Sequence, residues 1–308
     1  MLLTPANIAP TLDPATLERS AEAALALENF RAEFTADDAV FAAAFARAEA
    51  AASAALAGFE ADARQTGLAR LGLAAPVEAR NAASVLSATL VALDAPGDVA
   101  AVHDAIDPGD DEAPDALELD GRTLLVPAAL DHAWLVARRP FFLGNARTAR
   151  AIHAARLSTP IVPFPISSGW LADDTGYRTA LAAYERGDAN PMVLAQARAI
   201  DAAIDNARQL ATALAITRDD WHQSMVGVRS HAGSRELVGV ALEQPVIDAK
   251  LAVSTLGVTL AAAYTSIETL VERGILVSRG PERRNRAWFA PGILDAVDAF
   301  VDRARRSV

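Results

Sequence analysis

The chain has 308 residues, 52% of them hydrophobic, and a formal net charge of −11 at pH 7. Such an acidic chain is repelled by nucleic acid unless its basic residues cluster, and the absence of cysteine excludes disulfides and thiolate metal sites. The opening residues MLLTPANIAP lack the basic and apolar regions of a signal peptide, and no uncharged apolar run of about 18 residues is present, so we expect a cytoplasmic protein without membrane contact.

The N-terminal region, residues 1–76, carries helix signals. Asp13 and Pro14 suit the N-cap and first turn of a helix, and an apolar periodicity follows them. The alanine-rich run over 37–65 predicts one long helix, because alanine has the highest helix propensity. Period-two alternation is rare along the chain, so we expect little sheet.

The middle region, residues 77–232, is predicted to be a helical core. Its expected helices are 77–93, 126–139, a helix that ends near Leu157, and 191–215. Two segments break the pattern. The acidic, proline- and glycine-containing stretch 107–121 reads as a surface loop, and the proline-rich stretch 158–169 cannot be regular helix throughout.

The last region, residues 233–308, has a different pattern. It predicts helix, helix, turn, helix and hairpin, with Gly257 in the turn and Gly274 as a C-cap. The stretches ILVSRG and NRAWFAP are the two expected strands. This order is typical of a winged helix-turn-helix with a small β-hairpin. The expected fold class is therefore all-α, with N-terminal helices, a helical core and this C-terminal unit.

The stretch RRPFFLGNARTAR, Arg138–Arg150, is the most informative motif. Gly144 permits a tight turn, Asn145 is a good N-cap, and Arg147 and Arg150 lie on one helix face. A helix N-terminus with such neighbours can hold an anion. The alternative is that Asn145 only caps the helix and that the arginines pair with carboxylates such as Asp173 or Asp174.

Residues 139–150 resemble the motif of the Fic (Fido) family, His-Pro-Phe-x-(Asp/Glu)-Gly-Asn-Gly-Arg-x-x-Arg. The flanking segments AALDHAWLVARRPF and ISSGWLADDTGYRTAL are also similar to that family, and so is the C-terminal winged helix. The resemblance extends over about residues 78–300. It implies a Fic-type helical core in 77–232.

Fic enzymes transfer a nucleotide monophosphate, usually AMP from ATP, to a protein hydroxyl. In the family the motif histidine accepts the proton of that hydroxyl, and the acidic residue holds Mg²⁺ on the phosphates. The following loop and two arginines cradle the phosphates. The resemblance therefore implies a phosphate- or nucleotide-binding loop at Gly144, Asn145, Ala146, Arg147 and Arg150.

This sequence departs from the pattern at three positions. Arg139 stands at the histidine position and stays protonated, so it cannot be a general base, a loss of roughly 10²–10⁴-fold. Leu143 offers no oxygen to Mg²⁺, and the methyl group of Ala146 can crowd the phosphate. We expect no catalytic residue, no metal site and no AMP transferase activity. Arg139 either adds a third positive charge to an anion pocket or fills that pocket.

Three functions follow from this pattern. The first is a regulatory or binding protein of Fic fold, with ATP or another nucleotide as the candidate ligand and without Mg²⁺. The second is an adenylyl-, nucleotidyl- or phosphotransferase with altered chemistry, whose base comes from elsewhere. The third is a DNA-binding transcription regulator. A protein partner, DNA and a second copy of the chain all remain open as partners.

The DNA hypothesis depends on two groups of residues. The expected recognition helix offers Thr259, Tyr264 and Thr265, although Glu268 and Glu272 would face phosphates poorly. The wing is basic, with Arg279, Arg283, Arg284 and Arg286. The alternative is a dimerisation or docking unit whose arginines pair with the acidic body.

The histidines give no sign of a metal site. His132, on the helix before the motif, is expected to be a hydrogen-bonded core residue. The other four histidines are spaced irregularly and are not paired with carboxylates.

Overall fold

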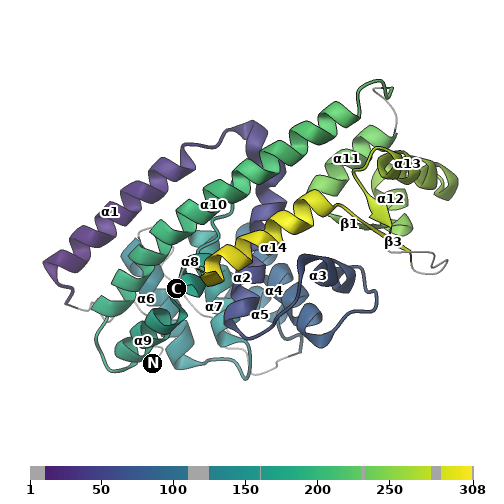
Figure 1. Cartoon of the computed structure of the whole chain (residues 1–308). Helices are drawn as coiled ribbons and strands as arrows, with labels where there is room; N and C mark the ends of the chain where they lie inside the picture. The colour runs from purple at the N-terminus through teal and green to yellow at the C-terminus, as the bar shows by residue number, and fades with distance from the viewer. Residues whose placement is uncertain (1–10, 110–124, 160, 230–232, 279–285, 307–308) are drawn as a thin grey trace.

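The computed structural model describes residues 11–109, 125–159, 161–229, 233–278 and 286–306. These residues form a helical protein with one three-stranded sheet (Figure 1). The predicted fold class, all-α with a small amount of β-structure near the C-terminus, is confirmed.

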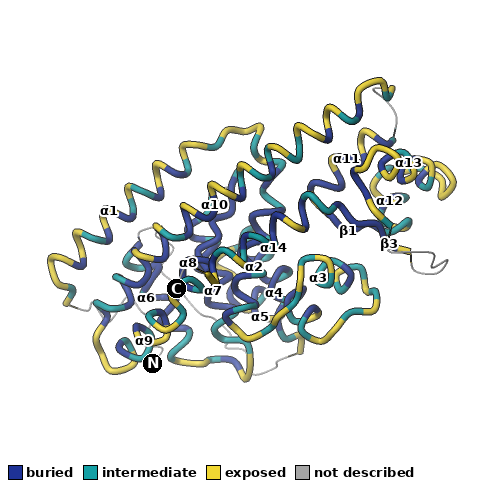
Figure 2. Tube along the Cα trace, in the orientation of Figure 1, coloured by how far each residue is buried: buried dark blue, intermediate teal, exposed yellow. Residues whose placement is uncertain are grey.

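The core is organised around α10, a 35-residue helix at Asn190–Ser224. Helices α1 (Pro14–Arg31) and α14 (Pro291–Arg306) both pack against it (Figure 1). Each of these three helices has a buried side and an exposed side (Figure 2). The most deeply buried large side chains include Trp170 and Phe300, which belong to one continuous apolar cluster.

Helix α2 (Ala42–Leu56) lies in the interior and packs against α4, α8 and α14. Together with the preceding 3₁₀ helix η2 (Ala36–Phe41), it is long and apolar enough to cross a membrane by length and composition. However, 61% of that stretch is buried inside the protein. Its alanines allow the close helix packing of a core element.

The remaining helices of the first 185 residues surround α2 and the motif. They are α3 (Ala63–Arg70), α4 (Val77–Asp94), α5 (Val99–Asp104), α6 (Leu125–Arg138), α7 (Asn145–Leu157), α8 (Ser167–Ala172) and α9 (Asp174–Glu185). The predicted single helix over 37–65 is wrong. Helix α2 ends at Leu56, and Gly58 just after it takes a left-handed conformation. Asp62 then caps the new helix α3 by accepting from the Gln65 N–H.

The C-terminal elements follow the order helix, strand, helix, helix, strand, strand. They are α11 (Gly233–Glu243), β1 (Val246–Asp248), α12 (Ala249–Leu256), α13 (Leu260–Glu272), β2 (Val277–Ser278) and β3 (Ala287–Phe289). The sheet is antiparallel in the order β1-β3-β2. The predicted turn at Gly257 and the two predicted strands are present. Strand β1, which is only three residues long, was not predicted.

Helix α14 was not predicted either, and it returns from the C-terminal unit to the helical core. It packs against α2, α3, α8 and α10. Two hydrogen bonds fix it there: Ala63 N–H donates to Asp298 (2.8 Å), and the Asn206 amide donates to the carbonyl of Phe300 (2.9 Å). Contacts therefore cross the predicted boundaries at 76/77 and 232/233, and the three-domain division stays a prediction.

Candidate functional site

The motif loop begins where α6 ends. Arg139 follows the last helical residue with φ 48°, and its N–H donates to the carbonyl of Leu135 (3.3 Å). This is a left-handed helix cap, which glycine adopts more easily than arginine. Pro140 then prevents the helix from continuing. The Arg139 side chain is exposed, so the alternative in which it fills a pocket is wrong.

The loop is held closed by its own residues. Phe141 is buried and stacks on His103, with ring centroids 3.7 Å apart and planes 9° from parallel. The Asn145 side chain accepts from the Phe141 N–H (2.9 Å) and donates to the Phe141 carbonyl (2.7 Å). Asn145 was expected to be the N-cap of α7, but Gly144 occupies that position and Asn145 is the first helical residue.

Gly144 is required at its position. Its φ of 76° is left-handed, and a Cβ there would lie 2.8 Å from the side chain of Ile106. The two residues before it, Phe142 and Leu143, point into solvent, with exposed fractions of 78% and 53%. The position that resembles the Mg²⁺ ligand of Fic enzymes is thus an exposed hydrocarbon, which does not fit a metal ion.

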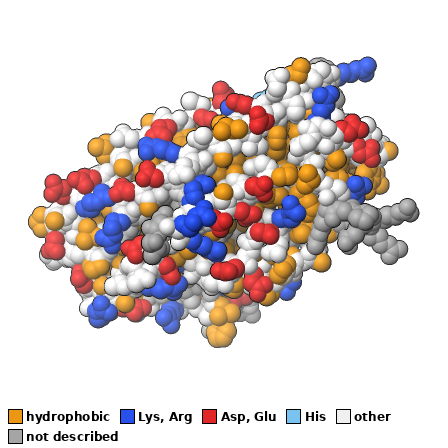
Figure 3. All heavy atoms as spheres, viewed as in Figure 1, with side chains coloured by type: hydrophobic (Ala, Val, Ile, Leu, Met, Phe, Trp, Pro, Cys, Tyr) orange, Lys and Arg blue, Asp and Glu red, His pale blue; other side chains and the backbone are white. Residues whose placement is uncertain are grey.

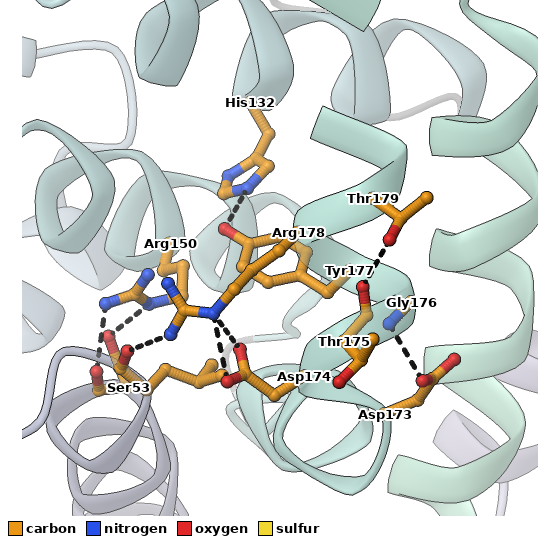
Figure 4. Close-up of polar contacts among 11 residues, drawn as sticks. Ser53, His132, Arg150, Asp173, Asp174, Thr175, Gly176, Tyr177, Arg178 and Thr179 are labelled. Carbon is orange, nitrogen blue, oxygen red and sulfur yellow. Dashed lines mark hydrogen bonds and ion pairs between the residues drawn. The ribbon is translucent and has the colours of Figure 1, made fainter. Parts of the chain in front are cut away.

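The Arg150 side chain is buried in the core. It is 2% exposed, and it donates from Nε to the Ser53 hydroxyl (2.8 Å) and from Nη2 to the Ser53 carbonyl (2.9 Å) (Figure 4). The alternative in which Arg150 pairs with Asp173 or Asp174 is wrong. Asp173 caps α9 through Gly176, and Asp174 forms an ion pair with Arg178 (Figure 4).

Arg147 is half-buried near the start of α7. Its guanidinium lies 5.1 Å from the ring centroid of Phe59, and its Nη1 atom is buried without a hydrogen-bond partner among the described residues. Burial and the charge of Arg150 lower the Arg147 pKa, while Asp107 opposes that shift. Gly144, Asn145, Ala146 and Arg147 therefore share the N-terminus of α7, whereas Arg150 is bonded to Ser53 of α2.

Helix α2 contributes two polar residues that the sequence analysis missed. Glu49 is fully buried and accepts from the backbone N–H of Ser167 (2.9 Å) and from its hydroxyl. Burial raises the Glu49 pKa to about 7, although the Ser167 hydrogen bonds and the charge of Arg150 act the other way. The signal was a Glu49–Ser53 pair, one helical turn apart in an alanine-rich helix.

His132 is a core residue, as predicted. It is 2% exposed, hydrogen-bonds the hydroxyl of Tyr177 through Nε2 (2.9 Å), and stacks on Trp170. Burial lowers the pKa of His132 and lowers that of His153 to about 3, so both rings are neutral at pH 7. In the described part of the chain, no three His, Cys, Asp or Glu residues form a group that could hold a metal ion.

Some of the predicted DNA-contacting residues make contacts within the protein itself. Thr259 caps α13 by accepting from Ala262 (3.3 Å), and Tyr264 packs edge-on against Trp288. Thr265 is exposed, and Arg286 lies over the Trp288 ring, 4.9 Å from its centroid. The other three predicted wing residues, Arg279, Arg283 and Arg284, lie outside the described residues.

Comparison with known proteins supports the fold. No family model matches the sequence, and no curated protein matches it. Among solved structures, the chain is similar to a Fic family protein from Desulfovibrio desulfuricans G20, with a TM-score of 0.52 and 16% identity. The match covers 92% of this chain and 98% of that one. At this identity the likeness establishes a Fic-type fold.

Proposed function

We propose that this protein is a Fic-fold binding or regulatory protein that does not transfer nucleotides. The observation that carries the proposal is the state of Arg150, the last arginine of the motif. It is buried and its Nε and Nη2 donors are directed at Ser53, so these two groups can serve a phosphate at the loop only if their bonds to Ser53 break. The residue types at the two other key positions, Arg139 and Leu143, supply neither a base nor a metal ligand.

A reduced anion site at the N-terminus of α7 is part of the proposal. The partial positive charge of a helix N-terminus favours an anion, and Arg147 has a buried Nη1 donor without a partner among the described residues. No acidic side chain occurs between Arg138 and Arg150, so the motif offers Mg²⁺ no carboxylate ligand. The ligand class is a phosphate-bearing anion, such as a nucleotide.

The test combines binding with transfer. ATP, AMP and inorganic phosphate are titrated by calorimetry with and without Mg²⁺, and transfer from labelled ATP to proteins of a cell extract is measured. We expect binding that does not depend on Mg²⁺, that weakens in Arg147→Ala and not in the exposed control Arg198→Ala, and no transfer. Transfer by the unmodified protein would overturn the proposal.

A variant with the family motif restored tests whether the motif substitutions alone prevent transfer. The triple variant R139H, L143E and A146G gives the loop the family pattern. We expect it to remain inactive, because Arg150 still donates to Ser53 and Asn145 still closes on Phe141. Gain of transfer activity in the triple variant would mean that the substitutions alone account for the missing chemistry, and that the Arg150 contact does not block the site.

DNA binding is the second candidate, favoured by the order of the C-terminal elements. Helix, strand, two helices and two strands is the winged-helix order, and α12 and α13 are bent by 107° at their junction. However, α13 carries Glu268 and Glu272 and no Lys or Arg. On the face seen in Figure 3, basic and acidic side chains are interspersed, without a continuous basic surface among the described residues.

A gel shift with the DNA upstream of the protein's own gene, at low salt, tests this candidate. If the wing contacts DNA, the shift disappears as salt is raised and is weakened in Arg286→Ala. Absence of a shift at low salt, where electrostatic contacts are strongest, would remove DNA from the candidate partners.

A further inference from the structure

A pocket lies between the helical core and the C-terminal elements. Residues of α2, α3, α4, β1 and α14 line it, together with Gln244 and Pro245; its cavity volume is about 80 Å³, within a space of about 630 Å³ that includes open solvent. Most of the lining is alanine, leucine and valine. The polar lining consists of Arg47, Thr66, Arg70 and Gln244.

The two arginines in this pocket donate hydrogen bonds to neutral acceptors. Arg47 donates to the carbonyl of Ala43 (3.0 Å), and Arg70 donates to the hydroxyl of Ser87 (3.1 Å); both acceptors are neutral. No ion pair of either arginine occurs among the described residues. Burial and the charge of Arg70 lower the Arg47 pKa to about 10, and Glu243 only partly opposes this. Two like charges beside an apolar wall are unfavourable unless an anion joins them.

We propose that this pocket binds a small amphipathic anion, with an apolar body and one carboxylate or phosphate group. The anionic group lies between Arg47, which is partly buried, and Arg70, which is exposed near the mouth. Guanidinium groups suit this role because they hold carboxylate and phosphate through paired hydrogen bonds. The apolar body contacts the alanine and valine side chains. A cation is repelled, and a neutral molecule leaves both charges unpaired.

The pocket is built from parts far apart in the sequence. Arg47 comes from α2, Arg70 from α3, Val246 from β1 and Val297 from α14. Helix α3 approaches β1 so closely that a Cβ on Gly67 would lie 2.2 Å from a methyl of Val246. A bound anion therefore contacts the helical core and the C-terminal unit together. The inference does not depend on the proposed function, because no motif residue lines this pocket.

Calorimetric titration with paired probes tests the inference on the full chain. Octanoate is matched with octanamide and phenyl phosphate with phenol, so that each pair differs in charge. We expect at least one anionic probe to bind about ten-fold or more tightly than its neutral partner. Arg47→Gln and Arg70→Gln each lower the binding affinity of that probe by about ten-fold. The exposed control Arg198→Gln changes that affinity by less than about two-fold.

Three results would overturn the proposal: failure of both anionic probes to bind, equal binding of the neutral partners, or an equal loss in Arg198→Gln. Arg70→Gln is the decisive variant if Arg47→Gln folds poorly, because Arg70 is exposed and its loss leaves the core intact. Folding of every variant is checked by circular dichroism. Loss of nucleotide binding at the motif loop leaves this test unaffected.

Discussion

Arg150 donates two hydrogen bonds to a single residue, Ser53, which lies 97 positions earlier in the chain. The Nε–H bond to the hydroxyl is 2.8 Å long, and the Nη2–H bond to the backbone carbonyl is 2.9 Å long. The pair joins α7 to α2 inside the core. A side chain that the motif resemblance assigns to phosphate therefore holds two helices together.

The first prediction concerns the stability that this pair supplies. Arg150→Ala removes a buried charged donor and leaves the Ser53 oxygens without it, so we expect a loss of about 2–4 kcal/mol in the free energy of unfolding, measured in urea. Ser53→Ala keeps the carbonyl bond and should lose less, about 1 kcal/mol. Arg198→Ala, on an exposed position of α10, is the control. An Arg150→Ala protein as stable as the control would contradict the structure.

The raised pKa of Glu49 predicts how the free energy of unfolding changes with pH. Its pKa rises from 4.5 in the unfolded chain to about 7 in the folded protein, so the folded state binds the proton more tightly. The stability that it contributes is complete below pH 4.5 and is lost as the pH rises through 7. At pH 8 we expect Glu49→Gln to be more stable than the wild type by roughly 3 kcal/mol, and at pH 4.5 to differ little.

Urea unfolding at both pH values measures this difference, and exposed Glu185→Gln is the control. Each variant is compared with the wild type at the same pH, because His153 changes the pH dependence of stability in the opposite direction to Glu49. Its pKa is lowered to about 3, so its contribution is present above pH 6.5 and is lost as the pH falls. A Glu49→Gln difference that does not change with pH would show that Glu49 titrates normally.

The left-handed backbone at Arg139 predicts an unusual response to glycine. Arg139→Gly relieves a conformation with φ 48°, so we expect it to raise the free energy of unfolding by about 1 kcal/mol. At the preceding position, the last residue of α6, Arg138→Gly should lower it by about 0.5–1 kcal/mol, because glycine is a poor helix former. Thermal unfolding of the two variants should give midpoints that move in opposite directions. Equal shifts would exclude strain at Arg139.

Two helical glycines predict opposite effects of a single methyl group. A Cβ on Gly169, in α8, would lie 1.9 Å from the carbonyl oxygen of Ala199 in α10. Gly169→Ala must separate these helices, and we expect a loss of more than about 3 kcal/mol. At Gly239, in α11, no atom from outside its own stretch of helix lies within 4 Å of the same position among the described residues. Gly239→Ala should be neutral or stabilising by up to about 1 kcal/mol, as measured by chemical denaturation. A stable Gly169→Ala protein would refute the α8–α10 contact.

Local signals determined much of the secondary structure and the main chemical conclusion. Asp13 and Pro14 start the first helix, Gly257 lies in the predicted turn, and the motif helix ends at Leu157. Gly274, the predicted C-cap, directly follows the C-cap Arg273 and has a left-handed conformation. These features depend on residues within one or two turns, which is why the pattern is sufficient. The chemical limits of Arg139 and Leu143 follow from residue type alone.

Other features could not be found from local patterns. The alanine-rich run over 37–65 has no strong breaker before Gly58, and β1 is only three residues long. Helix α14 is the exception: Ile293, Val297 and Phe300 follow Pro291 at helical spacing, a local signal that was overlooked. Asn145 suited an N-cap by type, but its side chain turns back to Phe141. For the 37–65 run, β1 and Asn145, packing chose between local conformations of similar energy.

The sequence by itself determined that this chain is helical, that its motif resembles the Fic pattern, and that the motif lacks a proton acceptor and a metal ligand. Only the tertiary structure decided where the arginines point. Arg150 finds its partner 97 residues away in α2, and Arg47 and Arg70 meet in a pocket completed by β1 and α14. The physical reason is that the partner of a side chain depends on which helices pack together, whereas residue type fixes only what that side chain can donate or accept.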